Sequence, residues 1–253
     1  MKTFCAIILS FISSLSFGQD VKIIEANLKE AFLKIDYKNA GSLTKSNEEF
    51  EKLLLKVTSS NPETILYDFK DLTSCGLTIA TSDDSLFRIY SWDTRSGGTM
   101  HYFENVFQFR NGKNTVSKKI FKNREEDRPD PGCFYYQIND ISVGDKKFYI
   151  AQGESILSTA LFYYKIKTFS ISGSKLMDDD RFIKTKSGYR SELGYAVDLS
   201  RVGSKDQDDN DSGYSIVYDK DNKKIILPLI LENGKISGKK IVYQFTGKCF
   251  EKL

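Results

Sequence analysis

The spacing of apolar residues follows two different rules along this chain. In the first part apolar residues recur every three to four positions, as at Leu28 and Phe32 and again at Phe50 and Leu54. This spacing puts them on one face of a helix. We therefore predict a helical segment over residues 19–71.

Local signals predict where these helices begin and end. Ser46 followed by Glu49 has the spacing of a capping box, which predicts that the second helix begins at Ser46. Pro62, placed directly after Asn61, is typical of the first position of a helix. A short third helix is predicted from this point and ends before Leu72.

In the rest of the chain, residues 72–253, apolar and polar residues alternate with a period of two, which is typical of half-buried strands. Short turn signals separate the runs, and Asn-Gly between alternating segments is a strong hairpin signal. These signals are Asn111-Gly112, Ser172-Gly173, residues 219–222 and Asn233-Gly234. The supply of 14 Tyr and 18 Phe also favours strands.

Three segments of the strand part resemble one another: residues 106–113, 168–175 and 242–248. Each is an aromatic-x-apolar strand that enters a glycine turn followed by lysine. Four strands can be drawn around each, in units over residues 72–128, 132–186 and 190–253. We predict a mainly β fold, with N-terminal helices followed by antiparallel meanders in three propeller-blade-like units. Because propellers typically close with four to eight blades, a β-sandwich is the alternative.

The first 18 residues have the order of a secretory signal peptide. Lys2 gives a positive start, residues 4–11 are almost wholly apolar, and Ser16 and Gly18 are small residues before a cut at Gln19. We expect a periplasmic or secreted protein. No later stretch is apolar enough to span a bilayer, so we expect no transmembrane segment in the mature chain.

Charge and cysteine content further limit the partners and the disulfides that we expect. The formal net charge is +3, which argues against nucleic acid as a partner. Cys75, Cys133 and Cys249 remain after cleavage, and their odd number leaves at least one free thiol. We expect buried thiols with at most one disulfide, whose pairing stays open.

Residues 91–101 (SWDTRSGGTMH) are the most unusual stretch and hold the only Trp and the only His. A strand that ends in Trp-Asp before a glycine-rich loop is a place where an aromatic platform and polar groups bind a ligand. The candidate binding residues are Trp92, Asp93, Arg95 and His101. The alternative, which the pattern favours, is a hairpin turn with Trp92 in the core and Asp93 bound to turn amides.

Asp206, Asp208 and Asn210 have the alternating spacing of calcium-loop ligands. The segment lacks the glycine at the sixth position, and Val217 stands where the twelfth-position glutamate belongs. A solvated loop is therefore the favoured interpretation, and calcium is the one cofactor considered. With a single His and no nucleophile motif, no catalytic residue is assigned.

Residues 86–94 (LFRIYSWDT) with 97–100 (GGTM) resemble a segment of exported bacterial proteins of unknown function. The C-terminal residues 240–248 (KIVYQFTGK) are similar to theirs as well. The resemblance spans most of the mature chain and implies one architecture throughout. It implies no activity and no site residue.

The function predicted from sequence is a non-catalytic β scaffold of the cell envelope that binds a ligand or a protein. Its partner would be an envelope glycan or protein. One alternative is a hydrolase acting on polysaccharide or cell-envelope material, which product release would reveal. Another is a structural assembly component, which stable monomers would count against.

Overall fold

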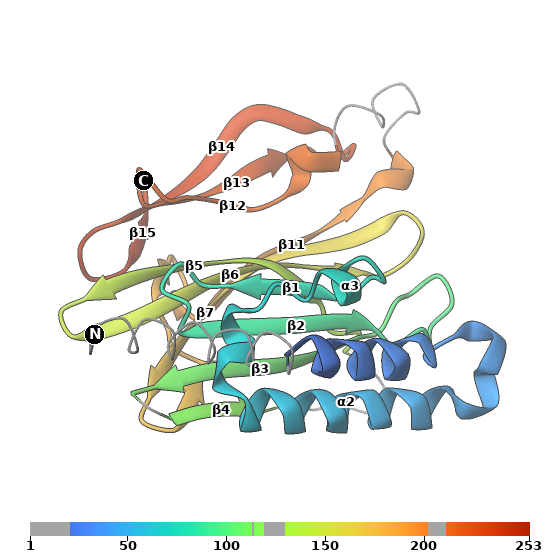
Figure 1. Cartoon of the computed structure of the whole chain (residues 1–253). Helices are drawn as coiled ribbons and strands as arrows, with labels where there is room; N and C mark the ends of the chain where they lie inside the picture. The colour runs from blue at the N-terminus through green and yellow to red at the C-terminus, as the bar shows by residue number, and fades with distance from the viewer. Residues whose placement is uncertain (1–20, 113, 119–129, 202–210) are drawn as a thin grey trace, which may run out of the picture.

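The computed structural model describes residues 21–112, 114–118, 130–201 and 211–253. Three sheets whose strands are mainly antiparallel lie in layers, and the helices form a further layer on the outer face of the first sheet (Figure 1). The predicted mainly β fold with N-terminal helices is therefore confirmed. Among the described residues, no helix has both the length and the apolar character needed to cross a membrane.

The helical layer begins with a helix over residues 21–33. Further helical elements follow: η1 (Tyr37–Ser42), α2 (Leu43–Ser60), η2 (Pro62–Leu66) and α3 (Lys70–Thr73). The predicted apolar faces are confirmed, because Leu28, Phe32, Phe50 and Leu54 are all buried. They pack in one hydrophobic cluster with residues of the first sheet, Trp92 among them. The helices therefore share their core with the strands.

One predicted helix boundary is wrong. α2 begins at Leu43 because η1 leads directly into it, and Ser46 is a buried residue inside the helix. The short helix predicted from Pro62 is the 3-10 helix η2, which ends at Leu66, before Leu72 as expected. A separate helix that the sequence did not predict, α3, contains Leu72. Glu25, from the first helix, accepts hydrogen bonds from the amides of Asp71 and Leu72 at 2.8 and 3.3 Å, and so caps α3. A cap supplied from so far away leaves no local sequence signal.

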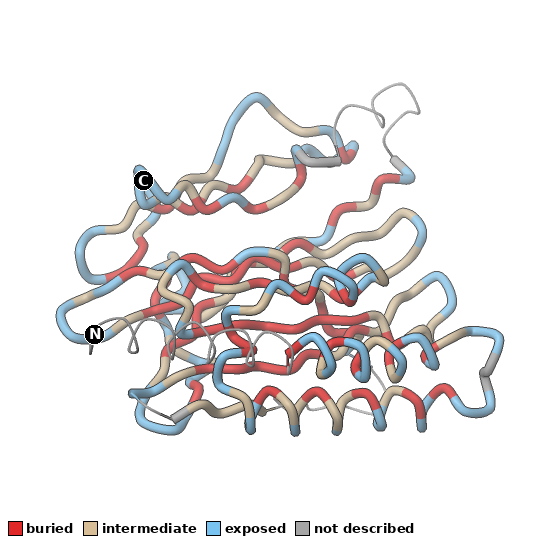
Figure 2. Tube along the Cα trace, in the orientation of Figure 1, coloured by how far each residue is buried: buried red, intermediate tan, exposed pale blue. Residues whose placement is uncertain are grey.

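The first sheet is a four-stranded meander in the order β1-β2-β3-β4. Its strands are β1 (Thr78–Thr81), β2 (Phe87–Asp93), β3 (Phe103–Asn111) and β4 (Asn114–Lys118). Both faces of this sheet are covered, and Figure 2 shows β2 and β3 buried along most of their length. Tyr90 and Trp92 face the helices, whereas Phe87 and Ile89 face the second sheet.

The second sheet follows the same plan, and one additional strand, β11, pairs with β7. The strands are β5 (Phe134–Val143), β6 (Lys146–Ile156), β7 (Leu161–Ser172), β8 (Lys175–Met177) and β11 (Glu192–Asp198). Phe87 of the first sheet packs on Tyr149 and Phe169 of the second, with ring centroids 5.1 and 5.4 Å apart. The aromatic residues thus fill the space between the two sheets.

The third sheet is the outermost layer, on the side opposite the helices (Figure 1). It contains β12 (Val217–Asp219), β13 (Lys224–Ile230), β14 (Ile236–Phe245) and β15 (Phe250–Lys252) as a meander, with β9 (Ile183–Thr185) and β10 (Gly188–Arg190) beyond β15. β9 runs parallel to β15. Two short 3-10 turns, η3 (Leu199–Arg201) and η4 (Asp211–Tyr214), complete the described elements.

The three similar sequence segments occupy equivalent places. Each supplies the third strand of a meander and the turn into the fourth, in the hairpins β3-β4, β7-β8 and β14-β15. Gly112 and Gly173 have φ of 60° and 59° in their turns, a conformation that glycine adopts without strain. The predicted propeller-like closure is not confirmed. The sheets pack face to face in layers, which is compatible with the β-sandwich alternative.

Candidate functional site

Trp92 lies in the core and offers no platform to a ligand. Its side chain is 1% exposed, and its ring meets Phe50 edge-on with centroids 5.2 Å apart. The indole Nε1 donates a hydrogen bond to Asn47 of α2 at 3.0 Å. Of the two interpretations drawn from sequence, burial in the core is the one that agrees with this position.

The other three residues predicted on this loop, Asp93, Arg95 and His101, are tied to their own surroundings. One oxygen of Asp93 accepts the Arg95 amide at 2.8 Å, and the other lies 2.7 Å from Nδ1 of His101. The Arg95 guanidinium donates to the carbonyl of Ile35 at 2.6 Å and lies over the ring of Tyr37. These contacts hold the loop against the end of the first helix.

The predicted calcium ligands Asp206, Asp208 and Asn210 lie outside the described residues. Within the described residues, no group of three or more His, Cys, Asp or Glu side chains is arranged to hold a metal ion.

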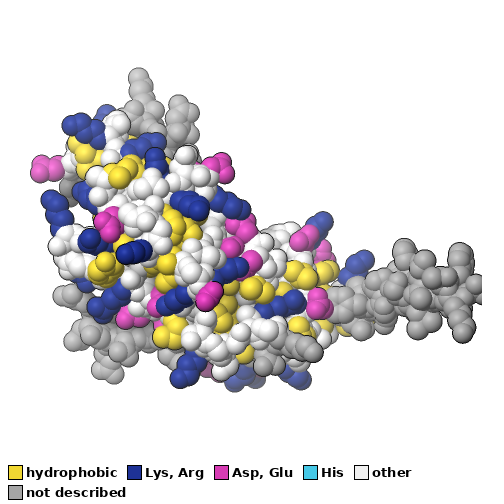
Figure 3. All heavy atoms as spheres, turned by 90° about the vertical axis from the view of Figure 1, so that its left-hand side faces the viewer, with side chains coloured by type: hydrophobic (Ala, Val, Ile, Leu, Met, Phe, Trp, Pro, Cys, Tyr) yellow, Lys and Arg dark blue, Asp and Glu magenta, His cyan; other side chains and the backbone are white. Residues whose placement is uncertain are grey.

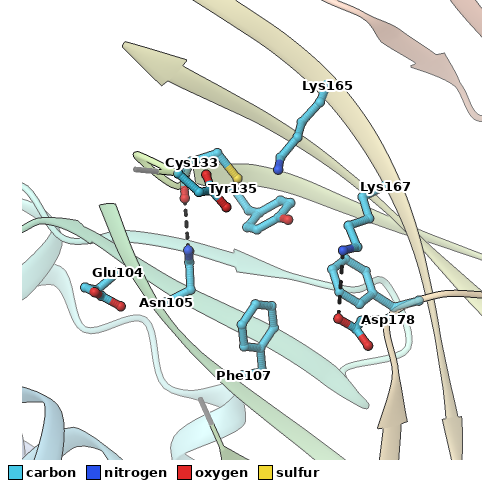
Figure 4. Close-up of a pocket in the computed structure, with 10 residues that line it drawn as sticks. Glu104, Asn105, Phe107, Cys133, Tyr135, Lys165, Lys167 and Asp178 are labelled. Carbon is cyan, nitrogen blue, oxygen red and sulfur yellow. Dashed lines mark hydrogen bonds and ion pairs between the residues drawn. The ribbon is translucent and has the colours of Figure 1, made fainter. Parts of the chain in front are cut away.

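A cavity of about 90 Å³ opens between the first and second sheets, where charged side chains interrupt the apolar core (Figure 4). Its lining comes from β3, from the segment before β5, from β5 and β7, and from the segment after β8. The lining residues are Glu104, Asn105, Phe107, Asp130, Cys133, Tyr135, Lys165, Lys167, Phe169 and Asp178.

The position of the two lysines follows from strand alternation. Lys165 and Lys167 flank Ile166 on β7, so both project to the side of the first sheet, while Ile166 is buried against the third. The nitrogen of Lys165 lies 3.6 Å from a carboxylate oxygen of Glu192 on β11. The nitrogen of Lys167 lies 3.9 Å from a carboxylate oxygen of Asp178.

Aromatic rings form the wall beneath these ammonium groups. Lys165 lies 5.7 Å from the ring centroid of Tyr135, and Lys167 lies 5.6 Å from that of Phe169. A cation over an aromatic face is an attractive contact, and it is stronger where water is partly excluded. The rings therefore help to hold both cations in place at the cavity.

The inner end of the cavity is rich in hydrogen-bond donors. Burial raises the pKa of the Tyr135 phenol well above its ordinary value. Burial alone would lower the pKa of Lys165. Attraction to negatively charged neighbours, Glu192 among them, outweighs burial and raises that pKa well above its ordinary value. At neutral pH the site therefore presents an ammonium group and a neutral phenol.

Hydrogen bonds between the two sheets make one wall of the cavity rigid. Asn105 on β3 donates to the carbonyl of Cys133 at 3.0 Å, the contact drawn in Figure 4. Asn105 also accepts from the hydroxyl of Ser91 at 2.6 Å, and that hydroxyl accepts the amide of Tyr135 at 3.0 Å. This arrangement fixes the segment that carries Cys133 and Tyr135 against the first sheet.

The amino-acid sequence carries only one weak local signal for this cavity. Lys165-Ile166-Lys167 places two lysines on the same side of a strand that is otherwise rich in aromatic residues. The other side chains come from distant parts of the chain. All three cysteines of the described residues are free thiols, and Cys133 is buried at the cavity.

The small size of the cavity limits what it can hold. Sites that enclose a drug-sized ligand measure about 300–1,000 Å³, so about 90 Å³ suits one functional group of a larger molecule. Ammonium, phenol and carboxylate groups together can bind a group that both donates and accepts hydrogen bonds. No protein-family model and no curated protein matches this chain.

Proposed function

We propose that this protein is an exported, non-catalytic binding scaffold of the cell envelope. In this proposal it holds a projecting group of an envelope glycan or protein in the cavity between the first and second sheets. The observation that carries the proposal is the pairing of charged groups around one small cavity, at the edge of an otherwise apolar interface between sheets.

Two features support a macromolecular ligand. The cavity accepts only a side-chain tip or a sugar substituent, so the rest of the ligand must lie outside it. The face drawn in Figure 3 is also mixed in charge, because basic and acidic side chains are interspersed there with apolar ones. A face of mixed charge is unlike the continuous basic patch that nucleic-acid binding uses. The signal peptide predicted from the sequence supports the proposed location in the cell envelope.

The test is a calorimetric titration of the exported protein with peptidoglycan fragments, envelope glycans and peptides. The informative variant is Lys167→Met with Asp178→Asn, which removes the pair at the cavity without changing the net charge. We expect this variant to bind at least about tenfold more weakly, equivalent to about 1.4 kcal/mol.

The matched control is Lys45→Met with Glu49→Gln, which removes an exposed ion pair of similar length on α2. It should leave affinity unchanged. Equal binding by the cavity variant would contradict the proposed site. Release of product from any ligand would contradict the non-catalytic assignment and favour the hydrolase alternative.

A further inference from the structure

The outer face of the third sheet carries two parallel rows of side chains. One row is aliphatic, and strand register places its first three members opposite one another: Val217, Ile226 and Val242. Leu253 continues this row, because its amide donates to the carbonyl of Val242 at 2.9 Å. Val217 is 45% exposed and Leu253 is 77% exposed. Solvent-facing sheet positions are ordinarily polar, so this row is unusual.

The neighbouring row is charged and spans five strands. Register fixes its order from β12 to β9, which is Asp219, Lys224, Gln244, Glu251, Lys184. The residues next to them, such as Tyr218, Ile225 and Phe250, are buried against the second sheet. Alternation therefore points the charged row outward.

The order of charges in this row is negative, positive, neutral, negative, positive. Turned end for end, it becomes positive, negative, neutral, positive, negative. A copy related by a twofold axis parallel to the strands, through Gln244, therefore places Lys184 over Asp219 and Glu251 over Lys224. The same axis places Leu253 over Ile226 and Val242 over its own copy. These two rows are therefore complementary to themselves.

The other twofold axis within the face, which runs across the strands, lacks this property. With that axis along the charged row, each residue lies over its own copy, and like charges meet at four positions. Like charges that face each other across an interface oppose association. Charge complementarity therefore selects one arrangement, with the strands of the two copies running in the same direction.

We propose that the third sheet is the interface of a symmetric dimer, whose occupant is a second copy of this chain. If the third sheets of the two copies packed face to face, each would cover the aliphatic row of the other. The layers of the second copy would then continue those of the first. Five strands spaced about 4.8 Å apart give a face about 24 Å wide. A face of this width buries a small area compared with most specific interfaces, so we expect a weak dimer. Its Kd would be on the order of tens of micromolar.

The test is sedimentation equilibrium of the exported protein from about 1 µM to 1 mM, a range that brackets the expected Kd. Lys224→Glu and Glu251→Lys should each weaken association about tenfold or more, because each sets like charges together twice across the axis. The double variant restores opposite charges and should return the Kd to within about threefold of the original.

Leu253→Ser tests the aliphatic row at a position exposed in the monomer, so folding is preserved. It should weaken association about tenfold, whereas Leu66→Ser, at a residue 53% exposed on the helical side, should leave it unchanged. A monomer over the whole concentration range would overturn the proposal. So would association that none of these variants changes, since the interface would then lie elsewhere.

Discussion

The ammonium nitrogen of Lys147 lies 2.7 Å from Oδ2 of Asp84, and this ion pair joins the second sheet to the turn before β2 in the first. The Tyr149 hydroxyl donates to the same oxygen at 3.2 Å. The other carboxylate oxygen accepts from the Ser82 hydroxyl at 2.6 Å and the Leu86 amide at 2.9 Å. Asp84 therefore connects two layers and is fully hydrogen-bonded.

This pair predicts how stability depends on pH. Burial opposes ionisation of Asp84, but hydrogen bonds from Lys147 and Ser82 outweigh it, so the pKa of Asp84 lies below its ordinary 3.8. The hydrogen bond to Asp84 raises the pKa of Lys147 above its ordinary 10.5. A lowered carboxyl pKa stabilises the fold above pH 3.8, and this stabilisation is lost as pH falls through the folded value. A raised lysine pKa stabilises the fold below pH 10.5, and this is lost as pH rises through its folded value.

We expect Asp84→Asn to lower the free energy of unfolding by about 1–3 kcal/mol at pH 7. The variant should also lose stability less steeply than the original protein between pH 5 and pH 2, the acid range in which a lowered carboxyl pKa acts. Thermal melting from pH 7 down to pH 2 measures both effects. Asp68→Asn, at an exposed carboxylate, is the control. Identical acid profiles for the protein and Asp84→Asn would contradict the prediction.

Arg88 attaches the helical layer to the first sheet through the backbone. It is 5% exposed, and its guanidinium donates to the carbonyls of Thr64 and Tyr67 at 2.9 and 2.6 Å and to the hydroxyl of Thr81 at 2.7 Å. Arg88→Met keeps the apolar stem but removes these three hydrogen bonds, one of which is fully buried. We expect a loss of about 2–4 kcal/mol in chemical denaturation. Arg181→Met, at an exposed arginine, should change stability by less than about 0.5 kcal/mol.

Gly194 on β11 is a glycine because an aromatic ring lies across it. A Cβ at this position would lie 2.4 Å from the hydroxyl oxygen of Tyr163 on the neighbouring strand. We expect Gly194→Ala to destabilise the fold by about 1–3 kcal/mol in chemical denaturation. Gly238→Ala, where a Cβ meets nothing within 4 Å, should have little effect. Tyr163→Ala should remove most of the cost of Gly194→Ala, and full additivity of the two changes would contradict this explanation.

The thiols give a separate prediction. Cys75 is partly exposed, whereas Cys133 and Cys249 are buried, and all three are free. Burial raises the pKa of Cys249, and the raised pKa reduces the fraction of this thiol that is present as the reactive thiolate. We expect Cys75 to react first with a maleimide in the folded protein, followed by the other two on unfolding, as measured by mass spectrometry. A reductant should not change the melting temperature. Thiols that stay unreactive in denaturant without reductant would reveal a disulfide and contradict this.

The sequence by itself determined the elements that depend on local contacts. The helical spacing around Leu28 and Phe50 identifies the buried faces, and the Asn111-Gly112 turn identifies a hairpin. These signals suffice because alternation and turn conformation are properties of adjacent residues. Three similar turn segments even located the third strand of each meander.

Tertiary structure decided how the meanders are joined and where the candidate site lies. β9 pairs in parallel with β15 through Ile183 and Phe250, and β11 joins the second sheet instead of the third. Trp92 is buried because α2 happens to cover it, and the cavity exists because Lys165 comes to lie near Cys133 and Tyr135. Such contacts form between segments far apart in sequence, and their energy comes from burial and pairing across layers, which no local pattern encodes.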